Sequence, residues 1–437
     1  MRLRTLACLL LLALLVPVAM LAVVSAPLDL QGNLNGQPYR IRVPANWNGT
    51  LLVYSYGYAE GYDLVPLTPL GSNTAGADEQ MLLDKGYALA GIRAAAAVNI
   101  PGGMGLAGFN MKERIQSQVA LTSMFRDMFG KPRRTITWGK SMGGLVALAL
   151  IESHPGLFDG AVPLCAPAAG TPRMFDQKLD ILLTFKAAFG WKDTWGTPDA
   201  LRPDLNVITE VAPFITQQEL ANWIEAYWKW EFLRMVNHIP ADPSFYNSPM
   251  NFRYQVIWLA FAPLADISGR AGGHAVQNVG RSYELSPDQI TQLKALGRDP
   301  ESLLAAMNAE ARYAADINAR NYVEHYYNPS GRIKRPILMM HTTHDAAVIP
   351  ENEGVYRELV TAQAKNGLLM QEFTTGVAVP PTNWIANTHC TFKPQQYIAG
   401  IDAMVLWLET GQKPDQAVYF PETAGFDTDF EPGNWPW

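Results

Sequence analysis

Charged residues are scarce in this sequence, and no basic run is present. Only 17% of the 437 residues are charged, and the formal net charge is -6. This balance argues against nucleic acid as a partner, because nucleic-acid-binding proteins cluster lysine and arginine on one face. Hydrophobic residues make up 48%, so the chain can bury a large core and is not disordered. Its length fits one large domain with an insertion, or two domains.

Cysteine, internal repeats, low-complexity segments and metal-binding motifs are also scarce or missing. Of the three cysteines, Cys8 lies in the apolar N-terminal stretch, which leaves the even pair Cys165 and Cys390. The pair is either reduced and buried or joined in a disulfide. No metal motif is visible, and we predict neither a metal nor a cofactor.

The N-terminus has the pattern of an export signal. Arg2 and Arg4 precede an uncharged apolar run over residues 6–24, and Val24-Ser25-Ala26 is a small-residue cleavage pattern. We therefore predict a signal peptide over residues 1–26 and a secreted or extracytoplasmic protein. The run is also long enough to approach a membrane span. A membrane is expected as a partner only if this segment is retained as an N-terminal anchor.

Strand and helix patterns alternate on both sides of a long helical stretch. Apolar and β-branched runs predict strands, and longer amphipathic runs predict helices. The expected strands are 39–43, 50–54, 86–92, 135–138, 160–165, 336–341 and 368–373, and the expected helices include 111–129, 142–152 and 395–408. This rhythm indicates an α/β fold with a mostly parallel sheet flanked by helices.

The stretch over residues 172–335 is mostly helical and rich in aromatic residues. Helices are expected over 217–236, 251–264 and 300–327, and Ser286 followed by Pro287 marks the start of another. We predict a helical lid here, inserted between a first core part (27–171) and a second core part with a C-terminal tail (336–437).

A serine lies at the centre of the most informative motif. The chain reads Gly139-Lys140-Ser141-Met142-Gly143-Gly144 between an expected strand and an expected helix. Glycines beside a serine in a sharp strand-to-helix turn expose its hydroxyl as a nucleophile. The alternative is an ordinary tight turn with a solvated serine.

An acid and a base follow Ser141 in the order that this type of sheet requires. Asp345 follows the expected strand 336–341, and His389 lies after the last expected strand, in Asn387-Thr388-His389-Cys390. The order Ser, Asp, His, with each residue after a parallel strand, predicts a catalytic triad. His341 and His344 are the competing histidines; His341 is expected to be packed, and His344 can line the site.

Two backbone N–H groups are expected to stabilise the oxyanion. One belongs to Met142, the residue after the nucleophile, and the other to Tyr58 in the loop Ser55-Tyr56-Gly57-Tyr58. A hydroxyl of Tyr56 or Tyr58 is the alternative donor.

These motifs resemble those of the α/β-hydrolases. The resemblance covers residues 50–167 and 336–408, and it implies a lid after the sixth strand. One departure is Tyr56, where many relatives have histidine before the oxyanion glycine. Some secreted esterases of the feruloyl esterase and tannase type are similar in tying the histidine loop with a disulfide, although there the partner cysteine adjoins the serine. This resemblance leads us to predict a Cys165–Cys390 disulfide.

The aromatic lid indicates the kind of substrate. Trp228 and Trp258, together with Tyr56, are candidates to bind an apolar or aromatic group, although most lid rings are expected to be core. No charged cluster stands out, which favours an uncharged ester. We therefore predict a secreted serine hydrolase that cleaves small-molecule or polymer-derived carboxylic esters of apolar or aromatic character through an acyl-enzyme.

Other functions use the same groups. An exopeptidase of the aminopeptidase kind needs a carboxylate to hold the substrate amine, and Glu225 or Glu231 can serve. An acyltransferase needs only another acceptor for the acyl group. A non-catalytic binding protein that keeps the fold is disfavoured by an intact triad.

Overall fold

The computed structural model describes most of the chain. The described residues are 26–58, 65–69, 76–93, 108–202, 204–240, 254–310, 312–375 and 389–437. Residues 1–25 of the predicted signal peptide lie outside them, as do Asn387 and Thr388 of the histidine motif. Within the described ranges, no helix has both the length and the apolar character that a membrane crossing requires.

An eight-stranded, mostly parallel sheet forms the centre of the molecule. Its strand order is β1-β2-β4-β3-β5-β6-β9-β10, with antiparallel pairing only of β1 with β2 and of β2 with β4. The strands are β1 (Leu28–Leu34), β2 (Gln37–Val43), β3 (Thr50–Ser55), β4 (Tyr87–Ile92), β5 (Arg134–Lys140), β6 (Gly160–Leu164), β9 (Ile337–Thr342) and β10 (Leu369–Thr374). The inner strands read as continuous apolar runs because helices cover both of their faces.

Helices pack on both faces of this sheet. Helices α2 (Met111–Phe129), α3 (Met142–Ser153) and α12 (Glu351–Ala362) lie on one face, and α1 (Ala77–Asp84) and α13 (Pro394–Thr410) lie on the other. Alternate strand residues point to opposite sides, as the pleat requires. In β3, for example, Leu51 and Val53 belong to the first apolar cluster, and Leu52 and Tyr54 belong to the second.

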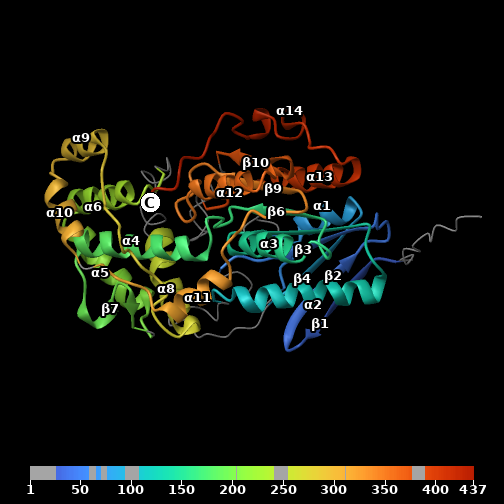
Figure 1. Cartoon of the computed structure of the whole chain (residues 1–437), viewed down its shortest axis with the longest axis horizontal. Coiled ribbons are helices and arrows are strands. Elements are labelled where there is room, and N and C mark those ends of the chain that lie inside the picture. Colours follow the sequence, from blue (N-terminus) through green and yellow to red (C-terminus); the bar gives the residue numbers. More distant parts are fainter. Residues whose placement is uncertain are drawn as a thin grey trace, which may run out of the picture.

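A large helical insertion separates β6 from β9. In Figure 1 it occupies the left side of the molecule, in green to orange, beyond the end of the sheet. We call the segment from Thr171 to His325 the helical insertion. Its elements are α4 (Thr171–Phe189), η1 (Asp193–Trp195), β7 (Gly196–Thr197), β8 (Ala200–Leu201), η2 (Val207–Val211), α5 (Ala212–Ala221), α6 (Trp223–Val236), η3 (Tyr254–Trp258), α8 (Leu259–Ala271), α9 (Pro287–Ala295), α10 (Glu301–Ala309) and α11 (Ile317–His325).

The structure confirms the expected strands and the helical nature of the insertion, but it breaks two expected helices. The helix expected over 217–236 is divided at Asn222, whose extended backbone and side chain cap α6 through a hydrogen bond from the N–H of Glu225. The helix expected over 300–327 is likewise two helices, α10 and α11. Ser286 does cap α9, in a capping box with Gln289. Strand β1 and the short pair β7–β8 were not expected.

The C-terminal tail connects the sheet to the helical insertion. After α14 (Gln416–Tyr419) and η5 (Glu422–Ala424), Phe426 pairs with Thr374 at the end of β10. The chain then ends beside the insertion, where the ring of Trp437 lies 4.8 Å from the guanidinium of Arg281 and 5.8 Å from the ring of His238. Figure 1 shows this path from α14 to the C-terminus near α6.

Candidate active site

Ser141 is the single residue between β5 and α3, and its backbone is strained. Its backbone has φ 57° and ψ -124°, a conformation that non-glycine residues rarely adopt. A Cβ on Gly139 would lie 2.2 Å from the carbonyl oxygen of Ser55, and one on Gly143 would lie 1.9 Å from the same atom. Both positions therefore require glycine, and the turn is held by a 2.8 Å hydrogen bond from the Ser141 N–H to Leu164.

Asp345 and His389 meet at the carboxyl edge of the sheet. The Nδ1 of His389 and the Oδ2 of Asp345 are 2.7 Å apart, and the N–H groups of Ala347 and Val348 each donate to the Asp345 Oδ1 at 2.9 Å. Burial opposes ionisation of Asp345, but His389, together with His341 and the Val348 N–H, outweighs burial and lowers the pKa of this carboxyl. Ser141 and His389 line the same pocket, and no hydrogen bond joins these two described residues.

The strand order, the serine turn and the chain order Ser, Asp, His occur together in one known architecture. The chain has the α/β-hydrolase fold. In this fold, the turn that holds Ser141 follows β5, Asp345 follows β9, and His389 follows β10.

Comparison with known proteins finds distant similarities to this chain. No model of a known protein family matches the chain. An o-phthalyl amidase from Xanthobacter agilis is 22% identical over 428 residues, which cover 87% of this chain and 87% of the amidase. An esterase structure from Aspergillus oryzae is similar over 89% of this chain and 80% of its own, at 12% identity and a TM-score of 0.43. An acylaminoacyl peptidase structure from Pyrococcus horikoshii is similar over 79% of this chain, at 10% identity and a TM-score of 0.35, and the chain spans 36% of its length.

A pocket opens over Ser141 between the sheet and the helical insertion. Its cavity volume is about 40 Å³, which is smaller than the roughly 150 Å³ cavity that holds benzene in another protein. An aromatic group therefore requires the flexible side chains of Met142 and Met174 to shift, which their unbranched thioethers allow. The pocket is lined by Tyr58, Phe109, Ser141, Met142, Pro167, Met174, Lys178, Leu259, Pro263, Ala347, Val348 and His389.

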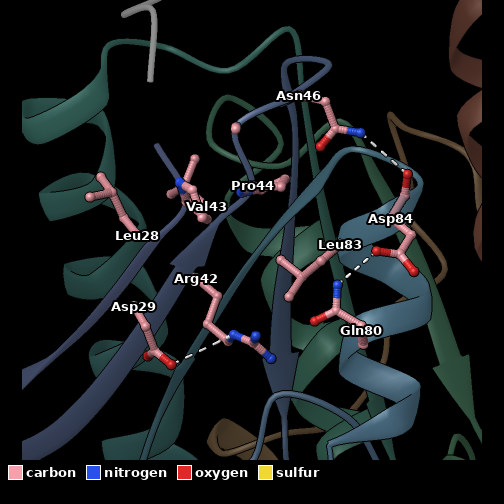
Figure 2. Close-up of a pocket in the computed structure, with 11 residues that line it drawn as sticks. Leu28, Asp29, Arg42, Val43, Pro44, Asn46, Gln80, Leu83 and Asp84 are labelled. Atoms are coloured by element: carbon pink, nitrogen blue, oxygen red, sulfur yellow. Dashed lines mark hydrogen bonds and ion pairs between the residues drawn. The ribbon is translucent and has the colours of Figure 1, made fainter. Parts of the chain in front are cut away.

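A larger hollow lies elsewhere, beside β1, β2 and α1. Figure 2 shows this pocket, which has a volume of about 450 Å³. Its polar side chains are engaged with one another: Gln80 donates to Asp84 at 2.7 Å, and Arg42 lies 3.7 Å from Asp29. None of the predicted catalytic residues lines it, so size does not identify the active site here.

The loop after β3 places Tyr58 at the pocket. Met142 is the first residue of α3, so the helix does not use its N–H group, and both residues line the pocket beside Ser141. Arg114 lies 3.7 Å from the ring centre of Tyr56 and donates to the carbonyl of Gly57 at 3.3 Å, which holds this loop. The predicted oxyanion donors are thus near the nucleophile.

The three residues predicted to bind substrate do not line the pocket. Tyr56 is buried under Arg114. Trp228 packs within the helical insertion, where its indole donates to Leu293 at 3.0 Å and its ring stacks on Phe232. The ring centres of Trp258 and Tyr58 are 5.7 Å apart, so Trp258 packs behind Tyr58, which itself lines the pocket.

The predicted Cys165–Cys390 disulfide is not formed in the structure. Both cysteines are buried free thiols, and the Cys165 Sγ lies 4.0 Å from the hydroxyl oxygen of Thr342. Burial raises the pKa of the Cys165 thiol well above its usual value, and the neighbouring Cys390 adds to this effect. Oxidation to a disulfide proceeds through the thiolate, which this environment disfavours.

A second histidine, His341, lies on the far side of Asp345. Its Nδ1 is 3.0 Å from Glu353, its Nε2 is 2.8 Å from the carbonyl of Val348, and the Nε2 is 3.7 Å from Asp345. Burial disfavours the imidazolium, but Glu353 and Asp345 outweigh burial and raise the pKa of His341. Cys165, His341 and Asp345 cluster closely enough to hold a metal ion, yet both ring nitrogens of His341 already face acceptors. The cluster therefore fits a hydrogen-bond network better than a metal site.

Lys178 is a charged residue of the pocket lining that sequence reasoning missed. It lies on α4, one turn after Met174, so the two side chains share the face that lines the pocket. Lys178 therefore brings a positive charge to the pocket, which the prediction of an uncharged ester did not take into account. The available signal was a lysine whose neighbours three and four positions away on the helix are all apolar, which indicates a buried charge; these neighbours are Met174, Phe175, Ile181 and Leu182.

Proposed function

We propose that this chain is a serine hydrolase that cleaves carboxylic esters or amides with an aromatic acyl group through an acyl-enzyme. The observation that carries the proposal is the 2.7 Å contact between Asp345 Oδ2 and His389 Nδ1. His389 lines the same pocket as Ser141, whose backbone is strained. A nucleophile, a base and an orienting acid are the groups that acyl transfer requires.

The proposed reaction has two halves. The Nε2 of His389 takes the proton from the Ser141 hydroxyl while the Ser141 Oγ attacks the carbonyl carbon. The Nδ1 proton stays on His389 and is donated as a hydrogen bond to the Asp345 carboxylate. The N–H groups of Met142 and Tyr58 bind the oxyanion. His389 then gives its proton to the leaving oxygen or nitrogen, and the acyl-enzyme forms. Water, deprotonated by His389, releases the acid and restores the Ser141 hydroxyl.

The relative from Xanthobacter agilis supports an amide as well as an ester. Its name, o-phthalyl amidase, describes amide cleavage and an aromatic acyl group. We carry both features to this chain as part of the proposal, together with the apolar pocket lining.

An aminopeptidase function has less support. Glu225 pairs with Arg298 at 2.8 Å on the surface, and Glu231 pairs with Arg234 at 2.8 Å. Neither glutamate lines the pocket over Ser141, so neither is placed to hold a substrate amine. Lys178 brings the opposite charge to the pocket.

Export is a further part of the proposal, supported by Arg2, Arg4 and the apolar run that follows them. Fractionation of cells that express the full chain tests it, because export predicts shortened protein outside the cytoplasm.

Covalent labelling tests the catalytic proposal. A fluorophosphonate probe is expected to modify Ser141, as mapped by mass spectrometry, and the protein is expected to hydrolyse p-nitrophenyl benzoate or benzoyl-p-nitroanilide. The Ser141→Ala variant should lose both properties. Ser153→Ala, at the other end of α3, is the matched control and should keep both. Absence of labelling in a folded wild-type protein, or labelling of another serine, contradicts the proposal.

A further inference from the structure

Helix α4 buries three charged side chains, and two of them have partners of opposite charge. Asp176 lies 2.7 Å from Arg320. Asp180 accepts a 2.6 Å hydrogen bond from Tyr283 and lies 3.4 Å from an arginine, Arg281. Lys178 differs, because no carboxylate of the described residues lies within 4.0 Å of its ammonium.

Lys178 is only 4% exposed, and its ammonium makes one hydrogen bond, to the carbonyl of Ala347 at 2.9 Å. An ammonium carries three N–H donors, so two have no protein acceptor among the described residues. A buried charge without a partner is costly. Burial lowers the pKa of Lys178 to about 8, and the charge of Asp345 opposes this shift, so the cation still predominates at neutral pH.

The surroundings of Lys178 indicate the chemistry of the ligand that the pocket would bind. Lys178 lines the same pocket as Ser141 and His389, and the other lining side chains are mostly apolar. A second donor lies nearby, since the buried hydroxyl of Tyr58 has no hydrogen-bond partner among the described residues. Burial raises the pKa of Tyr58 well above its usual value, which keeps the hydroxyl protonated as a donor.

We propose that the pocket selects an acyl group that combines an apolar, aromatic body with a carboxylate, and that the Lys178 ammonium binds this carboxylate as its counter-ion. The inference rests on the proposed acyl-enzyme function and adds the charge of the substrate to it. It replaces the expectation of an uncharged ester.

A purely structural role for Lys178 makes a different prediction. Lys178 donates to Ala347, and the Ala347 N–H donates to Asp345, so loss of the lysine can disturb the acid of the triad. Such a disturbance lowers turnover of charged and neutral substrates by the same factor. Loss of a carboxylate-binding group lowers turnover of the charged substrate alone.

Paired substrates separate these roles. The test measures kcat/KM for p-nitrophenyl benzoates with a carboxylate at the ortho, meta or para position, each against its neutral carboxamide analogue, with the uncatalysed rate subtracted. Wild type should prefer at least one carboxylate isomer by about tenfold to a hundredfold. Lys178→Met should reduce that ratio to about one and retain turnover of the neutral analogue. Lys186→Met is the matched control, because Lys186 pairs with Glu310 outside the pocket, and it should keep the wild-type ratio.

A binding experiment provides the same test without turnover. Calorimetry on the Ser141→Ala variant compares monomethyl esters of the benzenedicarboxylic acids with the matching methyl carbamoylbenzoates. Tighter binding of one acid, lost when Lys178→Met is added, supports the inference.

The inference is overturned if wild type shows no carboxylate preference or if Lys178→Met keeps the preference. It is equally overturned if Lys178→Met lowers kcat/KM for the carboxylate substrate and for its carboxamide analogue by the same factor. It is also overturned if preference appears only when the carboxylate is on the leaving group. These results are distinct from failure of the proposed function, in which Ser141 is not labelled and no ester or amide is cleaved.

Discussion

The sheet and the helical insertion contribute differently to one pocket. The sheet loops supply the proposed reacting groups, Ser141 and His389, and the insertion supplies Met174, Lys178 and Leu259. The backbone determines the first set, since a Cβ on Gly143 would lie 1.9 Å from a carbonyl oxygen. Side-chain packing determines the second. Changes in the sheet loops should therefore affect all substrates alike, and changes in the insertion should alter selection among them.

The largest effect is expected for Asp345→Asn. The amide still accepts from Ala347 and Val348, but its NH2 group faces His389 and favours the wrong tautomer of the ring. We expect kcat to fall about 10,000-fold for charged and neutral substrates alike. Steady-state or single-turnover kinetics on both substrates measure this loss.

Thermal unfolding of Asp345→Asn is the control, because the variant must stay folded. A loss below about tenfold, or a loss confined to one class of substrate, would show that Asp345 does not orient the base.

The next largest effect is expected in the insertion, for Phe185→Ala. Phe185 is fully buried, and its ring contacts those of Phe189, Trp191, Trp195, Phe214, Trp230 and Phe261. The substitution should lower the free energy of unfolding by about 3–5 kcal/mol, as measured by denaturant titration. The rate at which a small fluorophosphonate labels Ser141 should fall far less than it does in Asp345→Asn.

Leu220→Ala is the control for this substitution, because Leu220 is 84% exposed, and its effect should stay within about 0.5 kcal/mol. Equal loss of labelling in Phe185→Ala and Asp345→Asn would contradict the division of roles between the two regions.

The same division explains what the sequence could predict. The inner strands of the sheet have continuous apolar runs, and Gly139 and Gly143 bracket Ser141 at a fixed spacing, so local pattern predicted these strands and singled out Ser141. Asp345 and His389 were predicted from their order along the chain, each after a later strand. The order of β4 and β3 in the sheet depends on long-range pairing, which local pattern does not contain. In the insertion, Trp228 and Lys178 are both buried, and only tertiary packing determines which of them reaches the pocket.

The pH dependence of selectivity gives a smaller effect. The titratable groups around Lys178 are Asp345 and His389, and Tyr58 is the neutral donor. Because the pKa of Lys178 is lowered to about 8, the cation predominates below that pH and is lost above it. The ratio of kcat/KM for carboxylate over carboxamide substrate should stay constant below pH 8 and fall up to about tenfold per unit above it.

His389 acts on both substrates, so its protonation cancels in this ratio. In Lys178→Met the ratio should not change with pH. A wild-type ratio that is flat from pH 6 to about 10 would assign the selectivity to a group other than this lysine.

The smallest effect is expected where the tail meets the insertion. Trp437 lies over the guanidinium of Arg281, and Arg281 also lies 3.4 Å from the buried Asp180. Trp437→Ala should lower the free energy of unfolding by about 0.5–1 kcal/mol, because it removes one cation–π contact near the surface. Val418→Ala, a change at a side chain 68% exposed on α14, is the control and should be neutral. The carboxylate preference should stay at the wild-type value in both variants. A shift in that preference for Trp437→Ala would show that the tail acts on the pocket through α4, and selection would then depend on three regions of the chain instead of two.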